Sequence, residues 1–64
     1  MTVQQMIYFK TVAELEHMSK AAQKLHTAQS GISYAIAELE KELNVPLFKR
    51  TGRSISLTRY GREL

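Results

Sequence analysis

Two helical segments follow each other with almost no connection between them, and this spacing constrains the fold more than any other feature. Apolar residues recur at helical spacing in both: Ala21, Ala22 and Leu25 in residues 20–26, then Ile32, Ile36, Leu39 and Leu43 in residues 28–43. A connection of roughly one or two residues makes two helices cross steeply, because it leaves no room to turn back antiparallel. The spacing therefore predicts a helix-turn-helix over about 18–37.

An amphipathic helix over about 3–14 is predicted to precede this pair. Its apolar positions, which recur at helical spacing, are Met6, Phe9, Val12 and Ala13. Thr2 and Gln5 fit a capping box at its start, in which each side chain bonds to the backbone of the other residue. Ser19 and Thr27 are the hydroxyl residues expected to cap the second and third helices.

Strand-like alternation replaces the helical spacing after Pro46, the single proline of the chain. Residues 47–50 and 54–57 are predicted to form short strands. The loop between them, 51–53, contains Gly52, which can take the positive φ that tight hairpin loops require. A hairpin that directly follows a helix-turn-helix is typical of a winged helix.

The predicted fold is mainly α. It is a winged helix-turn-helix with a three-helix core, a two-stranded β wing over about 47–57 and the start of a linker helix. Thr58 can cap that last helix, of which residues 59–64 hold only about two turns. We expect a single domain over 1–58, with residues 59–64 as the truncated beginning of the linker helix.

The composition excludes several classes of protein. With 64 residues and no cysteine, the chain has no disulfide, no thiolate metal site and little room for a deep substrate pocket. It has no nucleophile–base pair, carboxylate pair or glycine-rich phosphate loop, and its two histidines lack spaced metal-ligating partners. We therefore expect no catalytic residue, metal or cofactor in this domain. The apolar stretches are too short to span a membrane, so we expect a cytoplasmic protein.

Charge is unevenly distributed along the chain. Residues 1–48 carry four lysines and five glutamates, a net charge of −1, whereas residues 49–64 carry five basic residues and one glutamate, a net charge of +4. A basic segment on a nearly neutral body is typical of contact with a polyanion such as the DNA backbone. It is equally typical of a solvated surface, and charge alone does not decide between the two.

The third predicted helix has its own charge pattern. Residues 27–37 contain no charged side chain, whereas residues 38–42 contain three glutamates. Phosphates would repel the glutamates, but an N-terminal half free of carboxylates can enter the major groove with its helix dipole facing the DNA backbone. This pattern favours residues 28–43 as the recognition helix of a DNA-binding protein.

Several stretches of the chain match a known family in both residues and spacing. They are 9–14, 19–26, 29–33 followed by Ile36, Leu39, Glu40 and Leu43, and 47–50 followed by Leu57, Thr58 and Gly61. Together they resemble the N-terminal DNA-binding domain of LysR-type bacterial transcription regulators. The resemblance implies sequence-specific binding of double-stranded DNA, with helix 28–43 in the major groove and wing residues 50–54 at the minor groove or backbone.

The same resemblance implies a larger regulator around this domain. Such a protein would bind an operator with interrupted dyad symmetry and self-associate, as a dimer or tetramer, through the linker helix that begins near residue 59. It would also sense a small-molecule effector through a C-terminal domain that this sequence does not contain.

Candidate DNA contacts fall into two groups. The base-facing candidates are Gln29, Ser30, Ser33, Tyr34 and Arg53, and the backbone-facing candidates are Thr27, Ala28, Lys49 and Arg50. The Gln29 amide can bond bidentately to adenine in the major groove. Arg53, at the predicted wing tip, suits the minor groove, because A·T tracts attract arginine there.

Some of these candidates have a structural alternative or depart from the family. Ser33 can bond back to its own helix, and Arg50 at the wing base can pair with Glu40. Many family members carry proline where Ser30 stands and arginine where Tyr34 stands. Tyr34 lacks the forked donor that reads guanine, although its ring could contact a thymine methyl and its hydroxyl a phosphate. The family's base preference is therefore not carried over.

A second function is open to the same fold. Winged helices also serve as protein–protein interaction modules. That role predicts exposed apolar residues on helix 28–43, whereas its expected outer face is Gln29, Ser30, Ser33 and Tyr34. The pattern favours DNA binding.

Overall fold

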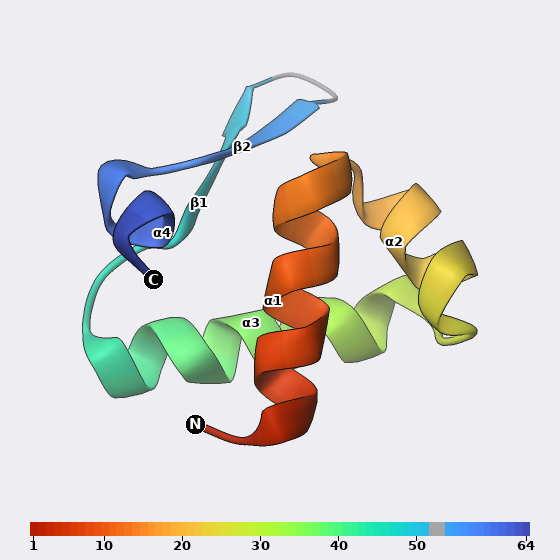
Figure 1. Ribbon diagram of the computed structural model, residues 1–64, viewed down its shortest axis with the longest axis horizontal. Helices are drawn as coiled ribbons and strands as arrows, with labels where there is room; N and C mark the ends of the chain where they lie inside the picture. The colour runs from red at the N-terminus through yellow and green to blue at the C-terminus, as the bar shows by residue number, and fades with distance from the viewer. Residues whose placement is uncertain (52–53) are drawn as a thin grey trace.

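The computed structural model describes residues 1–51 and 54–64. In chain order the elements are α1 (Val3–Leu15), α2 (Met18–Leu25), α3 (Gln29–Leu43), β1 (Phe48–Thr51), β2 (Ser54–Leu57) and α4 (Arg59–Glu63). The three long helices form the core, the antiparallel β1–β2 pair projects from it as a wing, and α4 lies beside the wing (Figure 1). The predicted winged helix-turn-helix is confirmed. None of the described helices has the length and hydropathy needed to cross a membrane.

The core lies where α1, α2 and α3 meet beneath the wing. Its buried side chains are Phe9, Val12, Ala21, Ala22, Ile32, Ile36, Leu39, Leu47 and Ile55. All of the predicted apolar positions are buried or half-buried, and Leu47 and Ile55 extend the core into the wing. The rings of Phe9 and Phe48 pack at a centroid distance of 5.3 Å, which joins α1 to β1.

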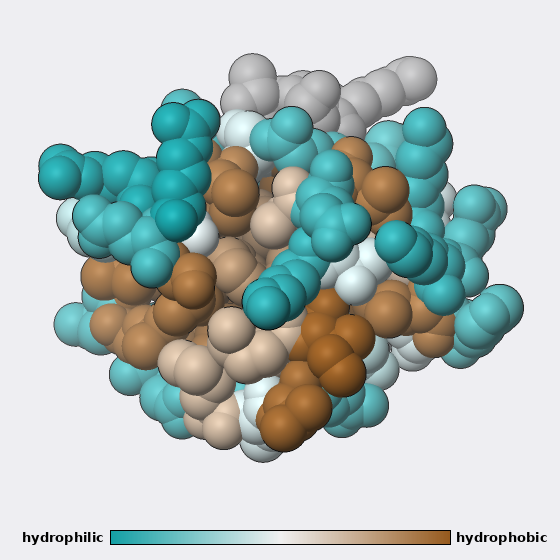
Figure 2. Space-filling view, in the orientation of Figure 1, coloured by the Kyte–Doolittle hydropathy of each residue, from teal (hydrophilic) through white to brown (hydrophobic). Residues whose placement is uncertain are grey.

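One apolar area stays outside this core. Met1, Val3 and Ile7 are exposed, and Figure 2 shows hydrophobic residues gathered over the N-terminal half of α1. The N-terminal half of α3, by contrast, exposes mostly polar side chains.

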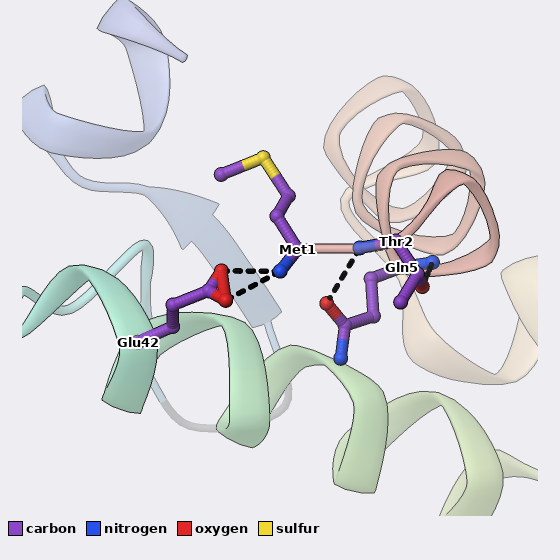
Figure 3. Close-up of polar contacts among 4 residues, drawn as sticks. All are labelled: Met1, Thr2, Gln5 and Glu42. Carbon is purple, nitrogen blue, oxygen red and sulfur yellow. Dashed lines mark hydrogen bonds and ion pairs between the residues drawn. The ribbon is translucent and has the colours of Figure 1, made fainter.

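The start of α1 has the predicted capping box. The backbone N–H of Gln5 donates to Thr2 Oγ1 at 3.0 Å, and the backbone N–H of Thr2 donates to Gln5 Oε1 at 3.1 Å (Figure 3). The terminal amine of Met1 pairs with the carboxylate of Glu42, so the beginning of α1 contacts the end of α3.

The caps of the other two long helices differ from the prediction. Ser19 is not the cap of α2: His17 is the N-cap, and its Nδ1 accepts from the backbone N–H of Lys20 at 3.2 Å. Thr27 is not the cap of α3 either, because the N-cap is Ala28, which has no side-chain hydrogen bond to offer. The turn between α2 and α3 consequently contains three residues, 26–28, rather than one or two.

Each of the three long helices ends on a non-glycine residue in the left-handed region. Glu16 has φ 49°, His26 has φ 55° and Asn44 has φ 58°. The left-handed conformation reverses the chain within one residue, which is how α1 passes to α2, and α2 to α3, over such short connections. Any side chain except glycine is strained there, and asparagine least so.

This strain yields a stability prediction. Replacing Glu16 by glycine should raise the free energy of unfolding by about 0.5–1 kcal/mol, because glycine takes φ 49° without a Cβ clash. Lys10→Gly is the matched control. It places the same residue inside α1, where it should cost about 1 kcal/mol. Urea unfolding of both variants measures the two effects, and a loss of stability in Glu16→Gly would contradict this account.

The wing is fastened to α3 by a carboxylate. Glu40 Oε2 accepts from the backbone N–H of Leu47 at 2.7 Å and from that of Phe48 at 3.2 Å. These amides lie at the point where the chain leaves the loop after α3 and enters β1. The carboxylate therefore sets where the wing begins relative to α3.

Removing this carboxylate should weaken the domain. Glu40→Ala is expected to lower the free energy of unfolding by about 1–2 kcal/mol, since two amides lose a charged acceptor. Glu40→Gln keeps one acceptor oxygen and should lose less than half as much. Thermal unfolding compares the two variants, and equal losses of stability would show that these hydrogen bonds do not account for the contribution of Glu40.

At the same end of the wing, where the chain leaves β2, Thr58 connects α4 to the loop before β1. Its Oγ1 accepts from the backbone N–H of Gly61 at 3.2 Å, which confirms Thr58 as the predicted cap, and it donates to the carbonyl of Pro46 at 2.5 Å. Gly61 is buried against Leu47 and Leu57. A Cβ on Gly61 would collide with the carbonyl oxygen of Leu47 and lie 2.7 Å from Leu57 Cδ2.

Candidate nucleic-acid interface

The N-terminus of α3 is open to an anion. Ala28 supplies no side-chain cap, and the first turn contains no acidic residue. The backbone N–H groups of Gly31 and Ile32 bond to the Ala28 carbonyl, so the amides that precede them are the ones left for an outside acceptor. Helix N-termini of this kind suit phosphate, because the amides and the helix dipole both favour negative charge.

Three predicted backbone and base contacts gather at this end of α3. Thr27, Ala28 and Gln29 line an open depression together with α2 residues. The α2 residues in its wall are Ser19, Ala22 and Gln23, with His26 at the turn. The helix-turn-helix thus presents its turn and the beginning of α3 on one continuous surface.

The outer face of α3 carries the predicted base-facing residues. Gln29 and Ser30 are exposed, and Tyr34 is 69% exposed. Ser33 is half-buried and lies instead at the side of α3 that faces the wing. Three of the four candidates on α3 therefore project away from the protein, and Ser33 borders the wing.

A cleft of about 310 Å³ separates this side of α3 from the wing. Ser33, Ile36, Ala37 and Glu40 line it from α3, Phe48, Arg50 and Ile55 from the wing, and Met18 from α2. The structure thus brings Ser33 and Arg50, which lie far apart in the sequence, to the walls of one cleft.

The two basic residues of β1 face different sides of the wing. Arg50 pairs with Ile55 across the hairpin, and both line the cleft beside α3. Lys49 pairs with Ser56, and because neighbouring strand residues alternate, its side chain leaves from the opposite face. Both are exposed, so the wing offers positive charge on both faces. Arg53, the predicted minor-groove residue, lies outside the described residues.

The alternative pairing of Arg50 with Glu40 is wrong. The ion pairs within the described ranges are Met1 with Glu42 and Lys24 with Glu14. Glu40 bonds instead to the backbone of Leu47 and Phe48, seven and eight residues further along. This leaves the guanidinium of Arg50 exposed beside α3. Sequence reasoning missed the role of Glu40, since nothing local marks a carboxylate that caps a distant strand.

These features define the winged helix-turn-helix class of nucleic-acid-binding domain. The family described as "Bacterial regulatory helix-turn-helix protein, lysR family" matches residues 3–62. The chain therefore belongs to the LysR family of bacterial regulatory proteins.

Relatives with curated descriptions agree with this assignment. Over 63 residues the chain is 59% identical to the transcriptional dual regulator GltC of Bacillus subtilis, covering 98% of this chain and 21% of that protein. It is 52% identical over 58 residues to the HTH-type transcriptional regulator YybE of the same organism, covering 91% of this chain and 20% of the relative. The chain thus spans about a fifth of the length of these relatives.

Solved structures share the fold closely. The DNA-binding domain of CbnR in complex with DNA superposes with a TM-score of 0.94 at 40% identity, covering 98% of this chain and 72% of that one. The DNA-binding domain of BenM in complex with benA site 1 DNA gives a TM-score of 0.92 at 36% identity, covering 98% of this chain and 73% of that one.

Proposed function

We propose that this chain is the DNA-binding domain of a LysR-type transcription regulator, with the N-terminal half of α3 in the major groove. The observation that carries the proposal is the start of α3, which has no side-chain cap, no carboxylate in its first turn and an exposed face of Gln29, Ser30 and Tyr34. The DNA-binding domains of CbnR and BenM, which share this chain's fold, have been solved in complex with DNA.

The place of each candidate residue on α3 or the wing suggests which part of the DNA it would contact. Thr27 and Ala28 would meet phosphate at the start of α3, while Gln29, Ser30 and Tyr34 would face base edges.

Ser33, with Arg50 across the cleft, would lie where α3 and the wing both approach the duplex, and Arg50 would contact phosphate. The exposed Lys49 would contact phosphate from the other face of the wing. Arg53 remains the residue that we propose for the minor groove.

The chain's place in a whole regulator is also a proposal. We propose that the protein self-associates through a helix that begins with α4, where Tyr60 and Leu64 are exposed, and binds an operator with interrupted dyad symmetry. A further domain would sense a small-molecule effector, this domain would act without a cofactor or catalytic residue, and the regulator would work in the cytoplasm.

The alternative of a protein-interaction module is not favoured. It requires an apolar surface on α3, but the exposed large hydrophobic residues other than Tyr34 lie on or next to α1 and α4: Met1, Val3, Ile7, Tyr60 and Leu64. Tyr34 is the exception on α3, and its neighbours Gln29 and Ser30 are polar.

Selection of binding sites from a random double-stranded DNA pool tests the proposal. We expect enrichment of a defined half-site, and gel-shift titrations of the winning sequence at two salt concentrations should show affinity falling as salt rises. Recovery of the unselected pool composition, or equal affinity for winning and scrambled sequences, would contradict sequence-specific binding.

Two substitutions separate base reading from backbone contact. Gln29→Ala should cost about 1–3 kcal/mol of binding free energy and relax discrimination at a single base pair. Lys49→Ala should weaken binding to all sequences alike and reduce the dependence on salt. Titrations against a set of single-mismatch operators measure both profiles, and the same profile for both variants would refute the assignment.

A further inference from the structure

Tyr34 is an aromatic residue that the fold does not use. It is 69% exposed, whereas Phe9 is buried and Tyr8 and Phe48 are half-buried. The Tyr8 hydroxyl is also engaged, since it accepts from Gln4 Nε2 at 3.1 Å. Tyr34 stands on the outer face of α3, in the stretch 29–37 that carries no charge. Packing and helix stability therefore do not account for a large ring here.

Gly31 stands three residues before Tyr34 on α3 and leaves open space on the surface there. Side chains of a helix lean toward its N-terminus, and the turn that precedes Tyr34 holds Ser30 and Gly31. A Cβ on Gly31 would meet only Thr27 Oγ1, at 3.4 Å, an ordinary contact. The fold therefore does not require glycine at position 31, although glycine weakens a helix relative to alanine. What the glycine provides is room on the exposed surface in front of the ring.

The ring and this space suit one feature of the major groove. A tyrosine side chain cannot form the bidentate hydrogen bonds by which arginine reads guanine or glutamine reads adenine. Its ring is an apolar surface, and the apolar group in the major groove is the C5-methyl of thymine. Residues 29–37 carry no charged side chain, and the nearest charge on α3 is that of Glu38, one turn C-terminal to Tyr34.

We propose that Tyr34 is a specificity-determining residue that selects thymine by packing its ring against the C5-methyl group, in the space that Gly31 leaves open. The inference rests on the proposed function, because it assigns a base preference to the same surface of α3. Gln29, five residues nearer the N-terminus, would read another base pair by hydrogen bonding.

Removing the methyl group from DNA tests this directly. In the operator obtained by selection, each thymine is replaced in turn by deoxyuridine, which keeps every hydrogen bond and lacks only the methyl. Wild-type protein should lose about fourfold in affinity at one thymine of each half-site, the effect of burying one methyl-sized group. Tyr34→Ala should bind thymine and deoxyuridine equally there, while Tyr34→Phe should keep the fourfold difference. Gln29→Ala is the matched control and should also keep it.

The outcomes separate the two proposals. If wild-type protein binds the operator specifically but no deoxyuridine substitution matters, or if the methyl dependence survives in Tyr34→Ala, the role of Tyr34 is refuted and DNA binding stands. A loss in Tyr34→Phe that is uniform across all sequences would assign the hydroxyl to a phosphate and also refute it. If wild-type protein prefers no sequence, the proposed function fails, and this inference fails with it. Thermal unfolding of Tyr34→Ala should match wild type, as expected for an exposed side chain.

Discussion

Gly61→Ala is expected to lower the free energy of unfolding by about 3 kcal/mol or more, the largest stability effect we anticipate from a single methyl group in this domain. The added Cβ would collide with the carbonyl oxygen of Leu47 and lie 2.7 Å from Leu57 Cδ2. A backbone carbonyl cannot rotate away as a side chain can, and that of Leu47 also accepts from the N–H of Thr58 at 3.0 Å. Relief of the clash therefore requires α4 to move off the wing.

Gly31→Ala is the matched control for this prediction. The new methyl group meets only Thr27 Oγ1, at 3.4 Å, and alanine favours the helix over glycine by about 1 kcal/mol. The same chemical change should thus stabilise the domain at position 31 and destabilise it at position 61. Urea unfolding of both variants measures the signs, and a stable Gly61→Ala protein with α4 still packed on the wing would contradict the account.

Ala28→Asp should reduce DNA affinity by at least 100-fold, about 3 kcal/mol, while making the protein more stable. Ala28 already has the extended backbone of an N-cap, with φ −77° and ψ 149°. An aspartate there would accept from the free amides of the first turn and interact favourably with the helix dipole, worth about 1 kcal/mol of stability. The same carboxylate would occupy the amides that phosphate needs and repel it.

Ala28→Ser separates the two effects. Serine also caps the helix but carries no charge, so it should gain similar stability and lose much less affinity than aspartate. Thermal unfolding and gel-shift titration of the two variants form the experiment. If Ala28→Asp binds DNA as tightly as wild type does, the start of α3 does not contact phosphate.

Helical and strand periodicity alone predicted the architecture well, but not the helix caps. The buried positions of α1, α2 and α3 follow directly from apolar spacing, and the Thr2–Gln5 box is a local pattern. The cap of α2 was missed, because an imidazole nitrogen seldom serves as the acceptor and Ser19 lies only two residues away. The cap of α3 was missed because Ala28 offers no capping group at all.

The contacts that position the wing depend on residues distant in sequence. Pairing with Arg50 was one possibility for Glu40, but its carboxylate accepts instead from the backbone N–H groups of Leu47 and Phe48, where the chain enters β1. Such a contact follows from the path of the backbone and not from any local motif. For the DNA-facing candidates, the sequence pattern predicted an outer face of α3, and Gln29, Ser30 and Tyr34 are exposed there. Their individual roles remain predictions.

The hydrogen bonds from Leu47 and Phe48 to Glu40 have a consequence for how the domain meets a duplex. They attach the wing to the same helix that would read the bases, so the spacing between the two contact regions is set when the chain folds. Binding then requires little further loss of conformational entropy between α3 and the base of the wing, and more of the contact energy is retained as affinity. Because the spacing between α3 and the base of the wing is fixed, the domain would bind weakly to half-sites whose grooves are spaced differently, whatever bases they present.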